Sequence, residues 1–223
     1  MNNLKYIAAI DMTGPFSSWC IADKNKKIIA KESIKISRKS NSLFFDTFRK
    51  RLKDLDVDFK DISKWYVGAG PGSYTGIRVA AAFVSGILFC KENMNVLGVP
   101  SYFPIAAEAG LKDSEKIGVI FQVTHKSVLI YNVTLSDGVL SSDDAPLLYD
   151  EKNIKEALDN YSKLVTIVDL ESNLLIKDTV MGDIVKLDSF PVERMFDHEC
   201  CANSRNIDDL IYTRPPVTTV PKG

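Results

Sequence analysis

The residues best suited to chemistry lie in one short segment, Gly68-Ala-Gly-Pro-Gly-Ser-Tyr-Thr-Gly-Ile-Arg78, which places four glycines in nine positions. Glycine permits positive φ angles and close backbone approach, and Ser73 or Thr75 can cap a helix that begins here. Because the N-terminus of a helix behind such a turn can bind an anion, one interpretation is a phosphate cradle. The other is a tight strand-to-helix turn without a ligand, and the residues alone leave the two even.

Well-known phosphate and nucleophile motifs do not match this segment. The Gly-Lys-[Ser/Thr] of a P-loop is absent, and Ser73 is followed by Tyr-Thr-Gly, which is not the spacing of a nucleophile elbow. A second phosphate loop is not evident in the C-terminal half, where Asp137-Gly138 is ordinary hairpin-turn chemistry. If the chain contacts a phosphate or a nucleotide, we expect the contacts at Asp11, Thr13, Gly70, Gly72 and Ser73.

Acidic and metal-ligating residues are too sparse for a catalytic centre. Asp11 ends the first predicted strand, but the fourth strand ends in Gly68-Ala-Gly, so the carboxylate cluster of a metal-dependent ribonuclease H-like nuclease is missing. The two histidines, His125 and His198, lie far apart, which disfavours a zinc site or a Ser-His-Asp triad. We therefore assign no catalytic residue and no metal ligand.

The helix predicted after the glycine-rich turn is unusually apolar. From Ile77 to Cys90 its single charged residue is Arg78, and a helix that is apolar on every side must be covered on every side. Small residues recur four apart, at Ala82 and Gly86 and at Ala81 and Ser85. This pattern fits a helix enclosed within one lobe or a surface that binds a partner, and in so small a lobe we favour the partner surface.

The elements that position these residues follow the order βββαβαβα. Strands are predicted at 6–11, 17–22, 27–36, 64–69 and 96–99, and helices at 40–55, 75–91 and 102–109, the last capped by Ser101. Phe44, Phe48, Leu52 and Leu55 form one face of the first helix, beside a basic stretch that we interpret as a solvated face. This order predicts an α/β fold of the ribonuclease H-like and actin-like kind, with a mixed five-stranded sheet flanked by helices in the first lobe.

A polar stretch near Gly110 suggests a boundary between a first lobe (1–110) and a smaller, divergent α/β lobe (111–223). Strands are predicted at 117–123, 128–133, 138–140 and 164–168, with helices at 151–161 and 195–202. The second half therefore resembles a smaller, degenerate copy of the first.

Composition favours a cytosolic protein that has no strong global attraction for nucleic acid. The chain has 223 residues, with 28 basic and 29 acidic side chains. Its N-terminal apolar run is too short for a signal peptide, and no stretch is long enough to cross a membrane. Its four cysteines lack Cys-x-x-Cys spacing, which fits free thiols in a reducing compartment.

The glycine-rich segment also carries a resemblance to a known family. Gly70-Pro-Gly-Ser-Tyr-Thr-Gly-Ile-Arg78 closely resembles the signature of the bacterial TsaB family, also called YeaZ. Ile10-Asp-Met-Thr13, Val96-Leu-Gly-Val-Pro-Ser101 and Tyr212-Thr-Arg-Pro215 are similar to further segments of that family. The resemblance covers the N-terminal half well and the C-terminal half loosely.

The resemblance implies a scaffold that pairs with a paralogue, TsaD, which carries the catalytic, metal-binding histidines. Together with the ATPase TsaE, the pair transfers a threonylcarbamoyl group (the t6A modification) to adenosine 37 of tRNA. It implies no cofactor of the chain's own, an ATP or ADP at the partner interface, only indirect contact with tRNA, and a homodimer when the chain is alone. The partner interface would involve the helices starting near Ser40 and Thr75, with Leu43, Phe44, Phe48, Ala81, Ala82, Ser85 and Gly86.

Two positions depart from the family pattern. Lys39-Ser40 replaces a usual His-Ser, and Val123-Thr-His125 stands where Asp-Ala-Arg is common. Both departures weaken the case for nucleotide or tRNA contact at those positions. Two alternatives stay open: a nucleotide-binding phosphotransferase of the actin-like superfamily that uses Asp11 and the glycine-rich turn, and a self-associating homodimer that has lost activity.

Overall fold

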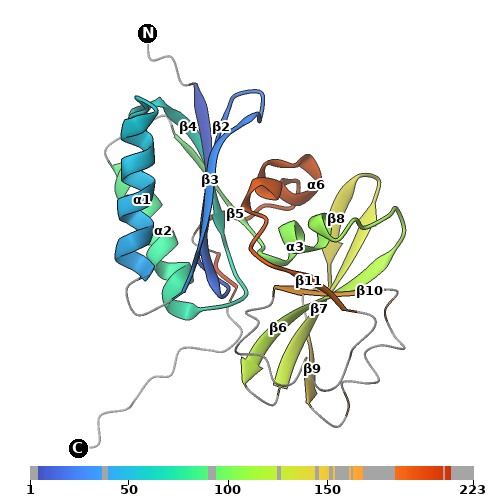
Figure 1. Ribbon diagram of the computed structural model, residues 1–223. Coiled ribbons are helices and arrows are strands. Elements are labelled where there is room, and N and C mark those ends of the chain that lie inside the picture. The colour runs from blue at the N-terminus through green and yellow to red at the C-terminus, as the bar shows by residue number, and fades with distance from the viewer. Residues whose placement is uncertain are drawn as a thin grey trace, which may run out of the picture.

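The structure is a computed structural model that describes residues 5–36, 40–89, 94–124, 127–143, 146–150, 153, 161, 163–167, 184–207 and 209–211. Two β-sheets make up its framework, with short helices between them and two longer helices on the far side of the first sheet (Figure 1). We call the first sheet with its two long helices the first lobe, and the second sheet the second lobe.

The first sheet has five strands in the order β3-β2-β1-β4-β5. Strands β1, β2 and β3 are antiparallel neighbours, whereas β4 lies parallel to β1 and β5 lies parallel to β4. This is the strand order of the ribonuclease H-like and actin-like folds, so the predicted fold class is confirmed. The strands are β1 (Tyr6–Asp11), β2 (Phe16–Asp23), β3 (Ile28–Lys35), β4 (Ile62–Gly68) and β5 (Asn95–Val99).

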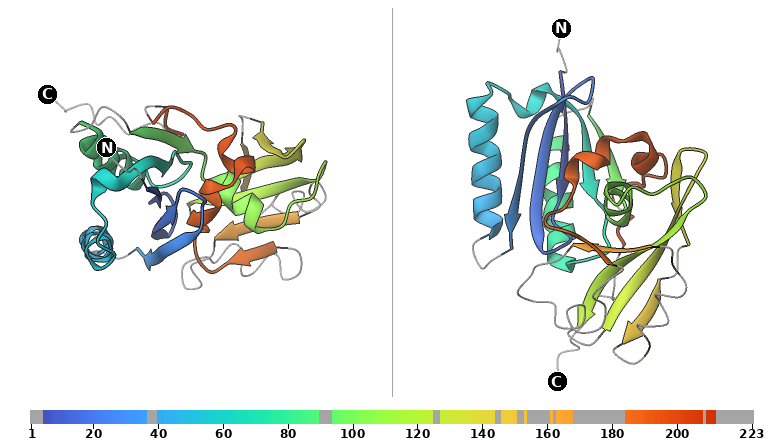
Figure 2. Two further views of the ribbon diagram at one scale, coloured as in Figure 1. Left: turned by 90° about the horizontal axis from the view of Figure 1, so that it is seen from above. Right: turned by 45° about the vertical axis from the view of Figure 1, so that its right-hand side comes forward.

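Helices α1 (Ser40–Asp54) and α2 (Tyr74–Phe89) lie side by side on one face of this sheet (Figure 2). A short 3-10 helix, η1 (Phe59–Asp61), leads from α1 to β4. Aromatic rings fill the space between the helices and the sheet: Phe48 lies 5.2 Å from Trp19 and 6.0 Å from Trp65, measured between ring centroids. The spacing of four residues between Phe44, Phe48 and Leu52 places all three on the buried face of α1.

The opposite face of the first sheet packs against two short segments near the C-terminus, η2 (Val192–Phe196) and α6 (His198–Cys201). Both contact α3 (Tyr102–Glu108), which in turn contacts the second sheet. The rings of Tyr102 on α3 and Tyr131 on the second sheet stack with their centroids 4.9 Å apart. One hydrophobic core therefore runs through both lobes. The division into domains at 110/111 stays a prediction; in the structure it falls between α3 and the first strand of the second sheet.

The second sheet repeats the topology of the first. Its order is β11-β10-β6-β7-β8, and β9 also pairs with β7. β6 and β7 are antiparallel, β10 lies parallel to β6, and β11 lies parallel to β10, as in the first sheet. The strands are β6 (Lys116–Thr124), β7 (Ser127–Ser136), β8 (Val139–Ser142), β9 (Leu147–Asp150), β10 (Lys163–Ile167) and β11 (Ile184–Leu187). The inferred copy of the first lobe is thus visible in the strand order.

Several predictions for the second half need correction or lie outside the described residues. Strands β9 and β11 were not predicted. The short helix expected at 195–202 is present as α6 (His198–Cys201), but it starts later than expected, because a separate 3-10 helix, η2 (Val192–Phe196), precedes it. The predicted helix at 151–161 lies almost wholly outside the described residues. The Asp137-Gly138 hairpin turn is confirmed, since both residues have positive φ angles.

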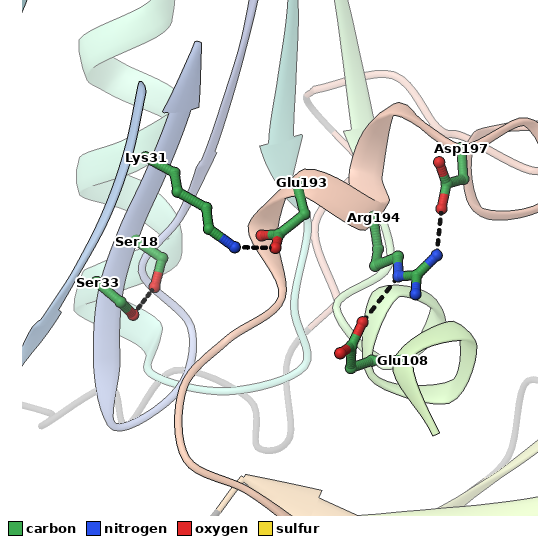
Figure 3. Close-up of polar contacts among 7 residues, drawn as sticks. All are labelled: Ser18, Lys31, Ser33, Glu108, Glu193, Arg194 and Asp197. Atoms are coloured by element: carbon green, nitrogen blue, oxygen red, sulfur yellow. Dashed lines mark hydrogen bonds and ion pairs between the residues drawn. The ribbon is translucent and has the colours of Figure 1, made fainter. Parts of the chain in front are cut away.

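After β11 the chain returns to the first lobe through η2 and α6. Figure 3 shows Glu193 reaching Lys31 on β3, and Arg194 reaching Glu108 at 2.8 Å and Asp197 at 3.3 Å. These side chains are partly exposed, and such ion pairs contribute little stability individually. Lys31, Glu108 and Glu193 border a cleft of about 450 Å³ between β3 and the segment after β11. Among the described helices, none has the length and apolarity needed to cross a membrane.

Candidate functional site

The glycine-rich turn joins β4 to α2, as predicted. The hydroxyl oxygen of Ser73 accepts a hydrogen bond from the backbone N–H of Gly76 at 3.2 Å, and its carbonyl accepts one from Ile77 at 2.9 Å. Ser73 is therefore the N-cap of α2, in the geometry that serine favours.

Two of the glycines are needed because the chain itself lies against them. A Cβ atom at Gly72 would lie 2.1 Å from the carbonyl oxygen of Thr13, and one at Gly76 would lie 1.8 Å from that of Met12. The backbone N–H of Ser73 also donates to the Thr13 carbonyl at 2.7 Å. The turn thus packs directly on the backbone that follows β1.

Gly70 also lies against a backbone carbonyl group, which here belongs to a residue distant in sequence. Its φ angle is +91°, and a Cβ atom there would lie 2.1 Å from the carbonyl oxygen of Ile211. Three carbonyl oxygens therefore approach the turn, whereas a phosphate needs hydrogen-bond donors. These contacts favour the tight-turn interpretation, and phosphate contact at Gly70, Gly72 and Ser73 stays a prediction.

Asp11 is fully buried at the end of β1. Its Oδ1 atom accepts hydrogen bonds from the backbone N–H and the hydroxyl of Thr13, at 2.9 and 2.8 Å, and its Oδ2 atom accepts one from Ser101 at 2.7 Å. Burial raises the pKa of Asp11 to about 6, because the desolvation cost outweighs the hydrogen bonds that favour the charged form. The carboxyl group is thus held by the chain's own donors.

Ser101 is the residue of this site that sequence reasoning misassigned. It was expected to cap α3, but its side chain makes no capping hydrogen bond and donates to Asp11 instead. The available signal was its place two residues after β5, because the carboxyl ends of parallel strands meet at one edge of a sheet. β1, β4 and β5 are parallel neighbours, so the ends of β1 and β5 lie close together.

The outer face of α2 is exposed, although it is made of small and apolar residues. Ile77, Ala80 and Val84 are buried against the sheet, Ala81 is partly buried, and Ala82, Ser85 and Gly86 are exposed. A Cβ atom at Gly86 would meet nothing within 4 Å, and the side chain of Phe89 is 94% exposed. The single charged residue, Arg78, lies over the ring of Tyr74 at 4.4 Å. Exposed apolar faces are common at interaction sites, and a partner interface on α2 stays a prediction.

The residues predicted on α1 divide between surface and core. Leu43 is 49% exposed, whereas Phe44 and Phe48 have no exposed surface. Both phenylalanines lie on the helix face that meets the sheet, so their side chains are unavailable to a partner. Of these three residues, only Leu43 has a side chain that a partner could contact.

The remaining residues singled out from the sequence add no second site. Lys39 and His125 lie outside the described residues. Within the described part of the chain, no three His, Cys, Asp or Glu side chains gather as a metal site requires. Burial raises the pKa of the Cys20 thiol to about 12, which disfavours the reactive thiolate.

Comparison with known proteins agrees with this architecture. Residues 32–169, more than half of the chain, match the family model described as TsaD, tRNA N6-adenosine threonylcarbamoyltransferase. YeaZ from Pseudomonas aeruginosa has a TM-score of 0.66 at 15% sequence identity, and the match covers 95% of this chain and 100% of that one. No curated protein matches the chain.

A second solved structure is similar over nearly the same length. It is an uncharacterized protein from Pseudomonas aeruginosa with similarity to the peptidase YEAZ, with a TM-score of 0.65 at 14% identity, and the match covers 94% of this chain and 99% of that one. At such identities the likeness concerns the fold, which the two structures share over both sheets.

Proposed function

The chain belongs to the TsaD family, tRNA N6-adenosine threonylcarbamoyltransferase, and we propose that it acts there as a non-catalytic partner subunit of the TsaB (YeaZ) kind. In this proposal it binds a TsaD-like paralogue that carries out the transfer of a threonylcarbamoyl group to adenosine 37 of tRNA. A TsaE-like ATPase completes the assembly, and this chain contacts tRNA only indirectly.

The observation that carries the proposal is the exposed outer face of α2. Small side chains at Ala82, Ser85 and Gly86 would let a partner helix approach closely, and Phe89 offers a large apolar side chain at the end of the same helix. We define the docking face as Leu43, Ala81, Ala82, Ser85, Gly86 and Phe89. An aromatic anchor beside small residues suits a partner with an apolar helix face of its own.

The state of Asp11 supports a structural role in place of catalysis. Its two carboxylate oxygens accept three hydrogen bonds from Thr13 and Ser101, and the side chain has no exposed surface. In the proposal the chain therefore has no cofactor of its own, and an adenine nucleotide, ATP or ADP, belongs to the interface with the partner.

Co-purification tests the proposal directly. The purified chain is mixed with the TsaD-like paralogue of its host, with and without ATP, and the molar mass is measured by light scattering after size exclusion. We expect a 1:1 complex that Ala82→Glu abolishes. The matched control is Ser136→Glu, which adds the same charge at an exposed position on the second lobe and should leave the complex intact.

Two other results would overturn the proposal. Failure of the wild-type chain to form any complex, with or without ATP, contradicts the partner role. The proposal also fails if the isolated chain hydrolyses ATP and Asp11→Asn abolishes this activity, a result that would support the phosphotransferase.

Without its partner, the chain is expected to form a homodimer, because a second copy would cover the same apolar face. Ala82→Glu should convert this homodimer to a monomer.

A further inference from the structure

The C-terminal segment, which we define as residues 202–207 and 209–211, is built into the first lobe. Arg205 pairs with Gly98 on β5 as an antiparallel bridge, in which each residue donates its N–H to the other's carbonyl, at 2.7 and 2.8 Å. A Cβ atom at Gly98 would lie 3.3 Å from the carbonyl oxygens of Arg205 and Asn206. The segment therefore lies along β5 as an added strand would, at close backbone contact.

A second attachment lies at the glycine-rich turn. The N–H of Ile211 donates to the carbonyl of Ala69 at 2.7 Å, and the carbonyl oxygen of Ile211 lies against the Cα atom of Gly70. The side chain of Ile207 packs against the core on the helix side of the first sheet, and that of Ile211 packs against the core on the opposite side. The segment thus straddles the carboxyl end of the sheet.

Gly70 links this segment to the start of α2. A Cβ atom at Gly70 would lie 2.9 Å from Cδ1 of Ile77 in the first turn of α2, and the carbonyl of Gly70 accepts a hydrogen bond from the N–H of Ser101 at 2.7 Å. Only Pro71 and Gly72 separate Gly70 from the N-cap, Ser73. The position of α2 therefore depends on a turn that Ile211 contacts on one side and Ser101 on another.

We propose that the C-terminal segment is a latch that holds the glycine-rich turn and the first turn of α2 in place. Its attachments include backbone hydrogen bonds, two partly buried side chains and one hydrogen bond from the Asn203 amide to the carbonyl of Leu140 at 2.8 Å. None of these holds a ladder of the first sheet together, so the segment can open without unfolding that sheet. Opening would release Gly70 and loosen the N-terminal turn of α2. In the part of the inference that rests on the proposed function, an open latch weakens partner binding, because α2 carries the docking face.

Native-state hydrogen exchange on the wild-type chain tests the latch without any substitution. If the segment holds the turn, the amides of Ser73, Ile77, Arg205 and Ile211 should have protection factors within about threefold of one another, since one opening exposes them all. Protection factors at Arg205 and Ile211 that are 100-fold lower than at Ser73 and Ile77 would overturn the inference, because the segment would then open while the turn stays closed.

Paired substitutions test whether removing a hydrogen bond of the C-terminal segment loosens the glycine-rich turn. Arg205→Pro and Ile211→Pro each remove one N–H donor, whereas Arg205→Ala and Ile211→Val keep it. We expect the proline variants to speed exchange at Ser73 and Ile77 at least tenfold and the controls to change it less than threefold. Proline variants that remain folded by circular dichroism and keep the wild-type exchange at Ser73 and Ile77 contradict the latch. If a proline variant fails to fold, the wild-type exchange pattern decides.

Measuring the affinity for the TsaD-like paralogue distinguishes a failure of the latch from a failure of the proposed function. We expect it to fall at least tenfold in the proline variants and to stay unchanged in the controls. If the wild-type chain binds no paralogue, the proposed function fails, while the exchange results still decide the latch. If the wild type binds and a folded proline variant with fast exchange binds equally well, the link between latch and docking face is wrong.

Discussion

The carboxylate of Asp11 lies directly against the Cα atom of Gly68, so that a Cβ atom at Gly68 would lie 2.0 Å from Oδ2 of Asp11. The two residues end the parallel neighbours β1 and β4. The end of β4 thus lacks an acid for a steric reason, because glycine makes room there for the acid of β1. Asp11, whose residue type and position suggest nucleotide chemistry, is therefore a buried residue of the core.

Asp11→Asn should remove a pH dependence of stability. The pKa of Asp11 is about 6 in the folded chain against an ordinary 3.8, so the folded state binds the proton more tightly. The free energy of unfolding should therefore fall by about 3 kcal/mol in total as the pH rises from 3 to 7, and about 2 kcal/mol of this fall should come between pH 4 and 6. In the variant, the amide oxygen still accepts from Thr13 and the amide nitrogen donates to Ser101, so it should be the more stable form at pH 7.

Urea unfolding of both forms between pH 4 and 8 measures this effect. Asp54→Asn, at an exposed position on α1, is the control and should leave the wild-type pH profile unchanged. An Asp11→Asn variant that is less stable than wild type at pH 7 would show that the charge of Asp11 is needed.

Ser101→Ala should destabilise the chain by about 2 kcal/mol at pH 7, because it removes the donor to a buried carboxylate oxygen. The effect should be smaller at pH 4.5, where Asp11 is protonated and the hydrogen bond is no longer made to a charge. Thermal unfolding at both pH values measures the difference, and Ser85→Ala on the exposed face of α2 is the control. An equal loss at the two pH values would mean that the Ser101 hydroxyl acts independently of the charge on Asp11.

Phe48→Ala should destabilise the chain by about 4 kcal/mol. Phe48 is fully buried, and its ring contacts those of Trp19, Trp65 and Phe83. Leu43→Ala, at a half-exposed position on the same helix, should cost less than about 1 kcal/mol. Equilibrium urea unfolding compares the two variants, and a similar, small cost for both would return Phe48 to the candidate interface residues.

Phe89→Ser should weaken binding of the TsaD-like paralogue at least tenfold and leave the free energy of unfolding within about 0.5 kcal/mol of wild type. Phe89 is 94% exposed, so its side chain contributes little to the packing of this chain. Its apolar surface would be buried only when a partner binds. Titration calorimetry gives the affinity. Leu148→Ser, which removes another exposed apolar side chain on the second lobe, is the matched control and should bind normally. Equal weakening by both variants would exclude a specific role for the end of α2.

The first lobe could be predicted from the sequence almost to the residue, because its signals are local. Strand β4 was expected at 64–69 and lies at Ile62–Gly68, and α1 was expected at 40–55 and lies at Ser40–Asp54. The second lobe was harder. β9 and β11 are four residues each and lie at the edges of their sheet, where a short segment carries too few alternating residues to form a pattern.

The fold class, the family resemblance, a cap at Ser73 or Thr75 and the apolar helix behind it could be read from the sequence, because these depend on residues close together along the chain; the structure chose Ser73 as the cap. The reason for the glycines at positions 70 and 72 is visible only in the folded chain. The oxygens that enclose Gly70 and Gly72 come from Ile211 and Thr13, and no local pattern links those residues. The tertiary structure also decided that Phe48 faces the core while the small residues of α2 face outward, because which face of a helix is buried depends on the sheet and the neighbouring helix against which it packs.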